Sequence, residues 1–444
     1  MIKKLGLATL SVIIIAAVYY YTAGSAQLAT EMKTEVNTQL ASLQTQGFLV
    51  EDREVSEKKE HFIISFDETE KIASFLNKQG AQVKAQDLAG FKGLKIGVDV
   101  AYLADAYSAA SFDMYPVSLP TSITTASLDE DEKKTLKQIE AMIEKKTFLV
   151  HVDVNKLGTG FKGHMKDIDE VIKGKGDVKL TMTALKFTGD LKDDKLSGIK
   201  QTLKNFTIST PDEFTAQFNN LTSNYAVTGT TKYDYDTSYT VEEMLFLAED
   251  GFKVQAKNLT MNSNSKVANN LASVTADTKV ASVHYTDDQK TTTLDTFIFD
   301  MKADNFDITA LEKLETIDPD NEKELLAVFQ QLISHGVHFE IPDCSVKEIE
   351  YEKQKIEGFK LSTTFDIDKS LDLATLEQNP MAAIGAMDAN LHLSLSNDLF
   401  ALIAKQPQAV MAMMLFQPKD VNGEKVYKVE LKDGSLKVND KPVM

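Results

Sequence analysis

Histidine side chains are the first candidates for chemistry in this sequence. The chain has seven histidines and a single cysteine. His335 and His338 lie three residues apart, but Gly336 between them is typical of the end of a helix. No acidic residue or cysteine completes a zinc-ligand set at a usual spacing. The sequence therefore predicts no metal site at this pair.

Acidic residues give no clearer sign of catalysis or cation binding. Two aspartates alternate with tyrosines in Tyr233-Asp234-Tyr235-Asp236, which predicts that both lie on one solvated strand face. A calcium loop would need more oxygen ligands and a glycine. The chain also has no Gly-x-Ser-x-Gly, no Gly-x-x-x-x-Gly-Lys and no His-Glu-x-x-His. We predict a protein that is not an enzyme and uses no cofactor.

Three asparagines, Asn205, Asn220 and Asn258, match the glycan sequon Asn-x-Thr. Such matches are expected by chance in an Asn- and Thr-rich strand protein. Cys344 is expected to be a small buried apolar residue, and as the one cysteine it excludes an intramolecular disulfide.

A methionine-rich segment between Pro407 and Pro418 could contact an apolar ligand. It is too short to span a bilayer. Two interpretations stay open: a helix buried against a sheet, or a flexible surface that binds an apolar ligand or partner. The residues that would form this apolar surface are Met411, Met413, Met414 and Phe416.

The N-terminus predicts a membrane anchor. Lys3 and Lys4 precede an apolar run over residues 5–24, which as a helix would span about 30 Å, the thickness of a bilayer's hydrocarbon core. The alternative is a secretory signal cleaved after Ala26. Three tyrosines favour the anchor because Tyr suits the headgroup level. The anchor residues are Leu5, Leu10, Ile13, Ile14, Ile15, Val18, Tyr19, Tyr20 and Tyr21.

Charge limits the partners of the chain. Its 444 residues carry a formal net charge of −18, which repels phosphate backbones and excludes nucleic acid as an expected partner. The positive-inside rule places Lys3 and Lys4 in the cytoplasm and the body outside it.

Apolar periodicity predicts both helices and strands. Helices are expected over residues 28–46, 68–78, 128–145 (with a capping box from Ser127 to Glu130), 241–248, 322–334 and 397–415. Period-two alternation predicts strands, with clear examples at 94–103, 148–155, 178–184, 297–302, 359–365, 391–395 and 427–432. Residues 48–50 and 62–66 are expected to form a hairpin or two neighbouring strands. Asn422-Gly423 and Asp433-Gly434 fit tight hairpin turns.

The predicted fold class is mostly β (α+β): an N-terminal transmembrane helix, then a large curved antiparallel sheet with a few flanking helices. The expected domains are the anchor (1–26), a juxtamembrane helix (27–47), a mixed α+β region (48–146) and a β-rich body (147–444). About a dozen strands are apolar on one side, and too few helices exist to cover them. The sheet must therefore curl on itself, meet a second sheet, or be covered by something external.

The layout resembles the YdgA-like family of bacterial proteins, which are anchored in the inner membrane and have unknown function. The resemblance lies in the N-terminal anchor, Met114-Tyr115-Pro116-Val117, residues 301–314 and the ending at 427–442, where Asp440 replaces the family's usual glycine. It implies a single-pass protein of the bacterial inner membrane, with a cytoplasmic N-terminus and a mostly β body in the periplasm. It supplies no catalytic residues.

Two functions follow as expectations. In the first, the apolar face of the sheet binds an amphiphile, a lipid or a periplasmic protein partner. In the second, the strands close into a dry core, and the protein is a structural or assembly scaffold without a small ligand. An enzyme has the least support.

Overall fold

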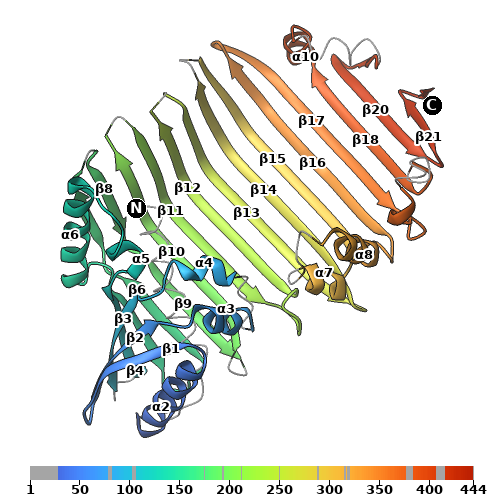
Figure 1. Cartoon of the computed structure of the whole chain (residues 1–444). Helices are drawn as coiled ribbons and strands as arrows, with labels where there is room; N and C mark the ends of the chain where they lie inside the picture. The colour runs from blue at the N-terminus through green and yellow to red at the C-terminus, as the bar shows by residue number, and fades with distance from the viewer. Residues whose placement is uncertain are drawn as a thin grey trace. The chain divides into compact units, whose positions relative to one another are not determined.

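The protein is described by a computed structural model that covers residues 29–78, 83–102, 107–174, 176–192, 195–211, 213–249, 251–287, 290–314, 317, 321–376, 384–406 and 416–443. The chain divides into two compact units, Met1–Asn224 and Tyr225–Met444. Both are built mainly from antiparallel strands (Figure 1).

The first unit combines eleven strands with short helices. Its helices are α2 (Ala29–Thr45), α3 (Thr69–Lys78), α4 (Ala85–Ala89), α5 (Thr121–Thr124) and α6 (Glu130–Glu144). Its strands are β1 (Phe48–Val55), β2 (Lys59–Phe66), β3 (Lys95–Tyr102), β4 (Ser108–Ser118), β5 (Val150–Asn155), β6 (Gly160–Met165), β7 (Ile168–Ile172), β8 (Val178–Thr183), β9 (Lys186–Lys192), β10 (Lys195–Thr210) and β11 (Phe214–Val227), which contains the boundary.

The strands of the first unit form an antiparallel meander. From β1 to β6, each strand pairs with the next one in the chain. Strand β6 then pairs with β9 and β7 with β8, while β9 and β8 pair with the two halves of β10. Strands β6 and β7 therefore act as two halves of one broken strand, and so do β8 and β9.

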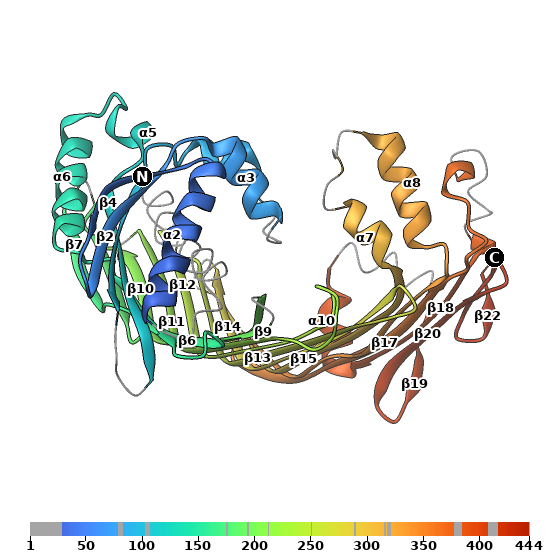
Figure 2. The ribbon, with the colours of Figure 1, turned by 90° about the horizontal axis from the view of Figure 1, so that it is seen from below.

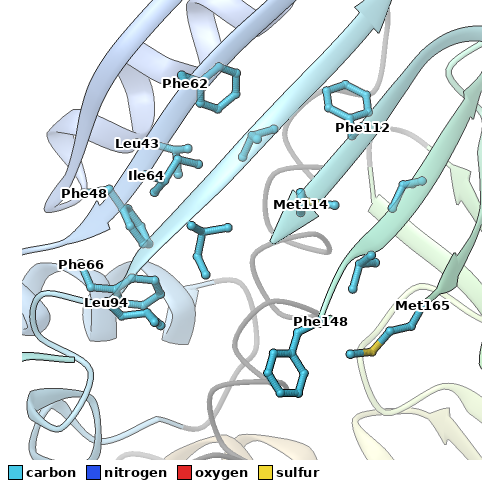
Figure 3. Close-up of a cluster of buried hydrophobic side chains, with 14 of the residues drawn as sticks. Leu43, Phe48, Phe62, Ile64, Phe66, Leu94, Phe112, Met114, Phe148 and Met165 are labelled. Carbon is cyan, nitrogen blue, oxygen red and sulfur yellow. The ribbon is translucent and has the colours of Figure 1, made fainter. Parts of the chain in front are cut away.

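One large core holds the first unit together. Alternate residues of β3 and β5, such as Val98 and Val150, are 1% exposed. They share a core with side chains from α2, α3 and α6, including Leu43 of α2 (Figure 3). Helices therefore cover the apolar face of this sheet, and the first unit has a buried apolar core.

The second unit has longer strands and fewer helices. Its strands are β12 (Tyr235–Ala248), β13 (Lys253–Ala268), β14 (Leu271–Asp287), β15 (Lys290–Asp307), β16 (Val337–Tyr351), β17 (Gln354–Ile367), β18 (Met387–Ser396), β19 (Lys419–Val421), β20 (Glu424–Lys432), β21 (Ser435–Val438) and β22 (Lys441–Pro442). Its helices are α7 (Ile308–Leu314), α8 (Glu322–Leu332), the 3₁₀ turn η1 (Leu373–Thr375) and α10 (Asn397–Ile403).

These strands also form a meander. Each strand from β12 to β18 pairs antiparallel with the next, and β20 pairs with β18 on one edge and with β19 and β21 on the other. Helices α7 and α8 stand on one side of this sheet, at the ends of its strands (Figure 2).

Irregular positions recur in the long strands. In the second unit they form one cross-strand row, the row of breaks, which consists of Glu242, Asn258, Ala281, Thr296, Lys347 and Gly358. Asn220, Asn258 and Thr296 have φ angles of 49°, 50° and 56° and follow one another at intervals of 38 residues. The register on the two sides of each break is the same: Lys257 pairs with Ser282 and Leu259 with Val280. The breaks line up across neighbouring strands, so no register shift accumulates.

This row restarts the alternation of side chains. Residues three apart in a regular strand point to opposite faces. In the first unit, however, Met165 and Ile168 lie on either side of a break and reach the same core, as do Met182 and Leu185. The same three-residue step recurs in the second unit at Val241/Met244, Val280/Val283, Leu294/Phe297, Val346/Ile349 and Ile356/Phe359. The apolar side chains on both sides of the break therefore share one face.

Most strand predictions are confirmed, as is the mostly antiparallel β fold class. The hairpin from residues 48 to 66 is β1 paired with β2. Both predicted tight turns have two consecutive positive φ angles, 52° and 87° at Asn422-Gly423 and 51° and 75° at Asp433-Gly434. The expected helices at 28–46, 68–78 and 322–334 correspond to α2, α3 and α8.

Several local predictions are wrong. The predicted helix at 241–248 is part of strand β12, because the three-residue step at the break imitates helical spacing. The capping box before α6 is formed by Asp129 and Glu132, two residues later than predicted. The described part of the predicted helix at 397–415 is α10 (Asn397–Ile403). Asp234 precedes β12 and is buried, accepting hydrogen bonds from Thr231 and Val267.

We predict that Gly358→Ala destabilises the second unit. Gly358 lies in the row of breaks, and a Cβ there would sit 1.9 Å from the carbonyl oxygen of Val346. The backbones must separate, which should lower the free energy of unfolding by about 1–3 kcal/mol in urea titrations. The control is Gly385→Ala, where a Cβ would meet no atom within 4 Å. Equal losses in both variants would contradict the steric explanation.

Candidate ligand-binding face

Most residues predicted to contact a membrane or ligand lie outside the described part of the chain. These are the nine anchor residues from Leu5 to Tyr21, and Met411, Met413 and Met414. Phe416 is described and is half-buried. Among the described residues, no helix has the length and apolar character needed to cross a membrane.

The structure brings apolar side chains together on the sheet of the second unit. Three cross-strand rows of this sheet are largely apolar, and we call their surface the apolar face. The first row is Val241, Leu259, Val280, Phe297, Val346, Phe359 and Leu395. The second is Tyr239, Met261, Thr278, Phe299, Cys344, Leu361, Leu393 and Tyr427. The third, beyond the breaks, is Met244, Ala256, Val283, Leu294, Ile349 and Ile356.

This face is unevenly covered. In the first row Val241, Val280, Val346 and Leu395 are buried, whereas the second row is partly exposed. Phe299, Leu361 and Leu393 are half-buried, whereas equivalent positions in the first unit, such as Val98, are almost fully buried. Met261 is 43% exposed and Tyr239 is 44% exposed. The free energy gained by full burial of such side chains is therefore still available to a ligand.

Helices close one end of the face. Phe306 lies between two small clusters: one contains Ala310 of α7 and Val328 of α8, and the other contains Ile333 and Leu371. Ile367 and Met387, at the ends of β17 and β18, pack against the second cluster. The helices thus cover the strand ends, and the three apolar rows lie beyond them.

The opposite, polar face carries a shallow depression of about 470 Å³. It crosses β16, β17, β18 and β20, and its lining includes Glu340, Ser362, Asn390, His392 and Lys428. His392 is exposed. Polar side chains and charged side chains of both signs line this depression, whereas the face behind it is apolar.

The histidine pair of the second unit is split between different carboxylates. His338 Nδ1 lies 2.6 Å from Asp366 Oδ1, and His335 Nε2 lies 3.8 Å from Asp307 Oδ2. Within the described ranges, no three histidine, cysteine or acidic side chains are arranged to hold a metal ion.

A titratable row crosses the first unit, and the sequence analysis missed it. The side chains alternate with the core positions of their strands and therefore lie on the face opposite the core. His61 Nδ1 is 2.7 Å from Asp99 Oδ1, and His151 Nδ1 is 2.6 Å from Asp113 Oδ1. In order across six strands, the row is His61, Asp99, Asp113, His151, His164 and Lys186.

The two opposed carboxylates in this row explain why a histidine lies on either side of them. Asp99 and Asp113 are direct cross-strand partners, and like charges in such pairs are destabilising. Burial alone would raise the pKa of Asp99, but hydrogen bonds with His61 and Lys146 outweigh it and lower that pKa. The hydrogen bond with Asp113 raises the pKa of His151. The structure therefore favours a charged imidazole beside Asp113.

We predict that the first unit loses stability as the pH rises through the raised pKa of His151. A raised pKa in the folded state stabilises the fold fully below the ordinary value of 6.5 and ceases to do so above the folded value. Asp113→Asn should remove about 1 kcal/mol of this pH dependence, measured by urea unfolding from about pH 6 to 9. Asp169→Asn, at an exposed carboxylate of β7, is the control. A slope unchanged by Asp113→Asn would refute this role for the pair.

Comparison with known proteins identifies the family of the chain. No match was found among curated proteins or among solved structures. Residues 118–443 match a family described as a bacterial protein of unknown function (DUF945). This match covers most of the first unit's sheet from the end of β4 onward and the whole described second unit. The chain therefore belongs to the DUF945 family of bacterial proteins of unknown function.

Proposed function

We propose that this protein is a non-enzymatic, membrane-tethered binding protein whose apolar face takes the acyl chains of an amphiphile or lipid. The observation that supports this most directly is the partial exposure of the second apolar row and of most of the third row in the second unit. Contiguous exposed apolar surface in a protein commonly marks a binding site or an interaction surface.

Acyl chains fit this face better than a folded partner protein does. The row from Val241 to Leu395 and the row from Met244 to Ile356 contain no side-chain nitrogen or oxygen. Protein–protein interfaces carry about one hydrogen bond per 100–200 Å². A hydrocarbon chain makes no hydrogen bonds to water, so it loses none when it binds to this surface.

The edge of the sheet also offers little to a partner strand. Asn439 uses its backbone N–H and its side-chain oxygen to bond the carbonyl and N–H of Lys428 in β20, at 2.8 and 2.9 Å. These contacts occupy backbone groups that an added strand would require. Binding through the side chains of the face is therefore favoured over strand addition.

The proposed location follows from the resemblance to the YdgA-like family. The N-terminal segment would be a single-pass anchor in the bacterial inner membrane, with the N-terminus in the cytoplasm and both units in the periplasm. The two N-terminal lysines, Lys3 and Lys4, agree with this orientation. A tethered body would keep its apolar face close to a source of lipid.

The alternative is a scaffold with no small ligand. The closed core of the first unit favours this role for that unit. Lipid analysis after native extraction separates the two functions, since a scaffold would carry no lipid and bind no apolar dye.

We predict that Leu393→Gln weakens binding of a fluorescent phosphatidylcholine about tenfold. The substitution places an amide in the second apolar row, and about 1.4 kcal/mol of lost apolar contact corresponds to a factor of ten. The matched control is His392→Gln, the neighbouring residue on the polar face, which should leave the affinity unchanged. Circular dichroism and urea unfolding check that both variants fold. Equal affinities for the two variants would place the lipid elsewhere.

We predict that Ile14→Arg releases the protein from membranes. An arginine at the centre of the segment adds about 2.5–3.5 kcal/mol to its insertion free energy, enough to cancel most of it. Fractionation of cells that produce the full chain measures the effect, with Ile14→Leu as the control. Full retention of Ile14→Arg in the membrane fraction would exclude this segment as the anchor.

A further inference from the structure

We infer that the apolar face selects amphiphiles with zwitterionic or uncharged headgroups and discriminates against anionic ones. This inference rests on the proposed function and names its class of ligand. It comes from charges on the same sheet as the apolar face. The second unit holds most of the excess negative charge of the chain.

Three aspartates stand in one cross-strand row on the polar face, in adjacent strands. Asp277 pairs with Asp300, and Asp300 pairs with Asp343. Asn262 donates to Asp277 at 2.9 Å, and Lys360 Nζ lies 3.1 Å from Asp343. One oxygen of Asp300 and one of Asp343 are buried without a hydrogen-bond partner. Lys360 therefore pairs with one of the three carboxylates, and Lys279 lies on the same face of β14 two residues from Asp277, so the charge of the row is only partly neutralised.

A second acidic row lies on the polar face beyond the breaks. In this row Glu243 of β12 pairs with Lys257 of β13. Asp295 of β15 pairs with Glu348 of β16, which pairs with Glu357 of β17. Lys355 neutralises part of this charge by an ion pair with Glu348 at 2.7 Å. Carboxylates thus lie behind the apolar face on both sides of the row of breaks.

The apolar face itself offers no free cation. Its three rows contain no charged residue. The residue that extends the first row into β20 is Lys425, which pairs with Leu395 and forms an ion pair with Asp420. An anionic headgroup would therefore find no arginine or lysine to replace its hydration.

The negative charge acts across the sheet. Packed layers on a sheet lie about 10 Å apart, and the Debye length is about 10 Å at 0.1 M salt. Protein of low dielectric constant separates the carboxylates from a bound chain, and it screens less than water does. An anionic lipid is therefore repelled at low salt, and a zwitterionic lipid with the same acyl chains is not.

The experiment compares two fluorescent lipids with the same acyl chains, a phosphatidylcholine and a phosphatidylglycerol, on the detergent-solubilised full chain. We expect phosphatidylglycerol to bind about fivefold to tenfold more weakly at about 0.05 M salt. The difference between the two affinities should disappear near 1 M salt, where the Debye length is about 3 Å. The affinity for phosphatidylcholine should change little over this range.

Charge variants test which residues cause the difference in affinity between the two lipids, which we call the gap. The triple variant Asp277→Asn/Asp300→Asn/Asp343→Asn should narrow it at low salt. The control Glu130→Gln/Glu140→Gln/Glu144→Gln removes the same charge from exposed positions of α6 and should leave the gap unchanged. Should the aspartate variant fail to fold, the salt series on the unaltered protein still tests the inference.

The outcomes are distinct. Equal affinities, tighter binding of phosphatidylglycerol, or a gap that salt does not change would overturn the headgroup selection and leave the apolar binding face in place. Binding of neither lipid would overturn the proposed function, and the headgroup selection with it.

Discussion

The unequal two faces of an antiparallel sheet are the constraint on which this structure depends. Each strand presents apolar side chains on one side and polar side chains on the other, and burial of one apolar side chain contributes about 1.5–3 kcal/mol. The first unit satisfies the constraint internally, because α2, α3 and α6 share a core with its strands. The second unit has longer strands, and α7 and α8 pack only at their ends. Most side chains of its second and third apolar rows are therefore left partly in contact with water.

The aligned breaks allow long strands to keep their apolar side chains on one face and their polar side chains on the other. A strand of 14 or more residues with strict alternation would need one uninterrupted pattern, and the sequence instead changes phase at the row of breaks. Residues in the left-handed region restart the alternation, and neighbouring strands do so in the same row. Asparagine tolerates this conformation better than most residues, which explains why Asn220 and Asn258 occupy it. Both also match a glycan sequon, so a backbone requirement accounts for these two matches.

The sequence was sufficient to predict most strands and insufficient to predict which side chains the register brings together across strands. Period-two patterns such as Phe359, Leu361 and Phe365 predicted β17, and the positive φ angles of the two tight turns follow directly from Asn-Gly and Asp-Gly. Apolar spacing over residues 241–248 suggested a helix where pairing with β13 forms a strand, because the step at the break imitates the helical period. The row from His61 to Lys186 was missed because its members come from six strands, and only the register brings them together. The three-residue step between apolar positions, as at Val280/Val283 and Leu294/Phe297, was the signal of the breaks that the sequence contained.

The register across the breaks has a consequence for how such a sheet can vary. From β11 to β15 the long strands repeat a unit of 38 residues, with a left-handed residue in every second strand. Because neighbouring ladders stay in phase on both sides of that position, one hairpin could be duplicated or deleted without disturbing those beside it. The width of the sheet, and with it the amount of hydrocarbon it could accommodate, would then change in steps of one hairpin. Relatives of different length should accordingly differ by whole multiples of this unit.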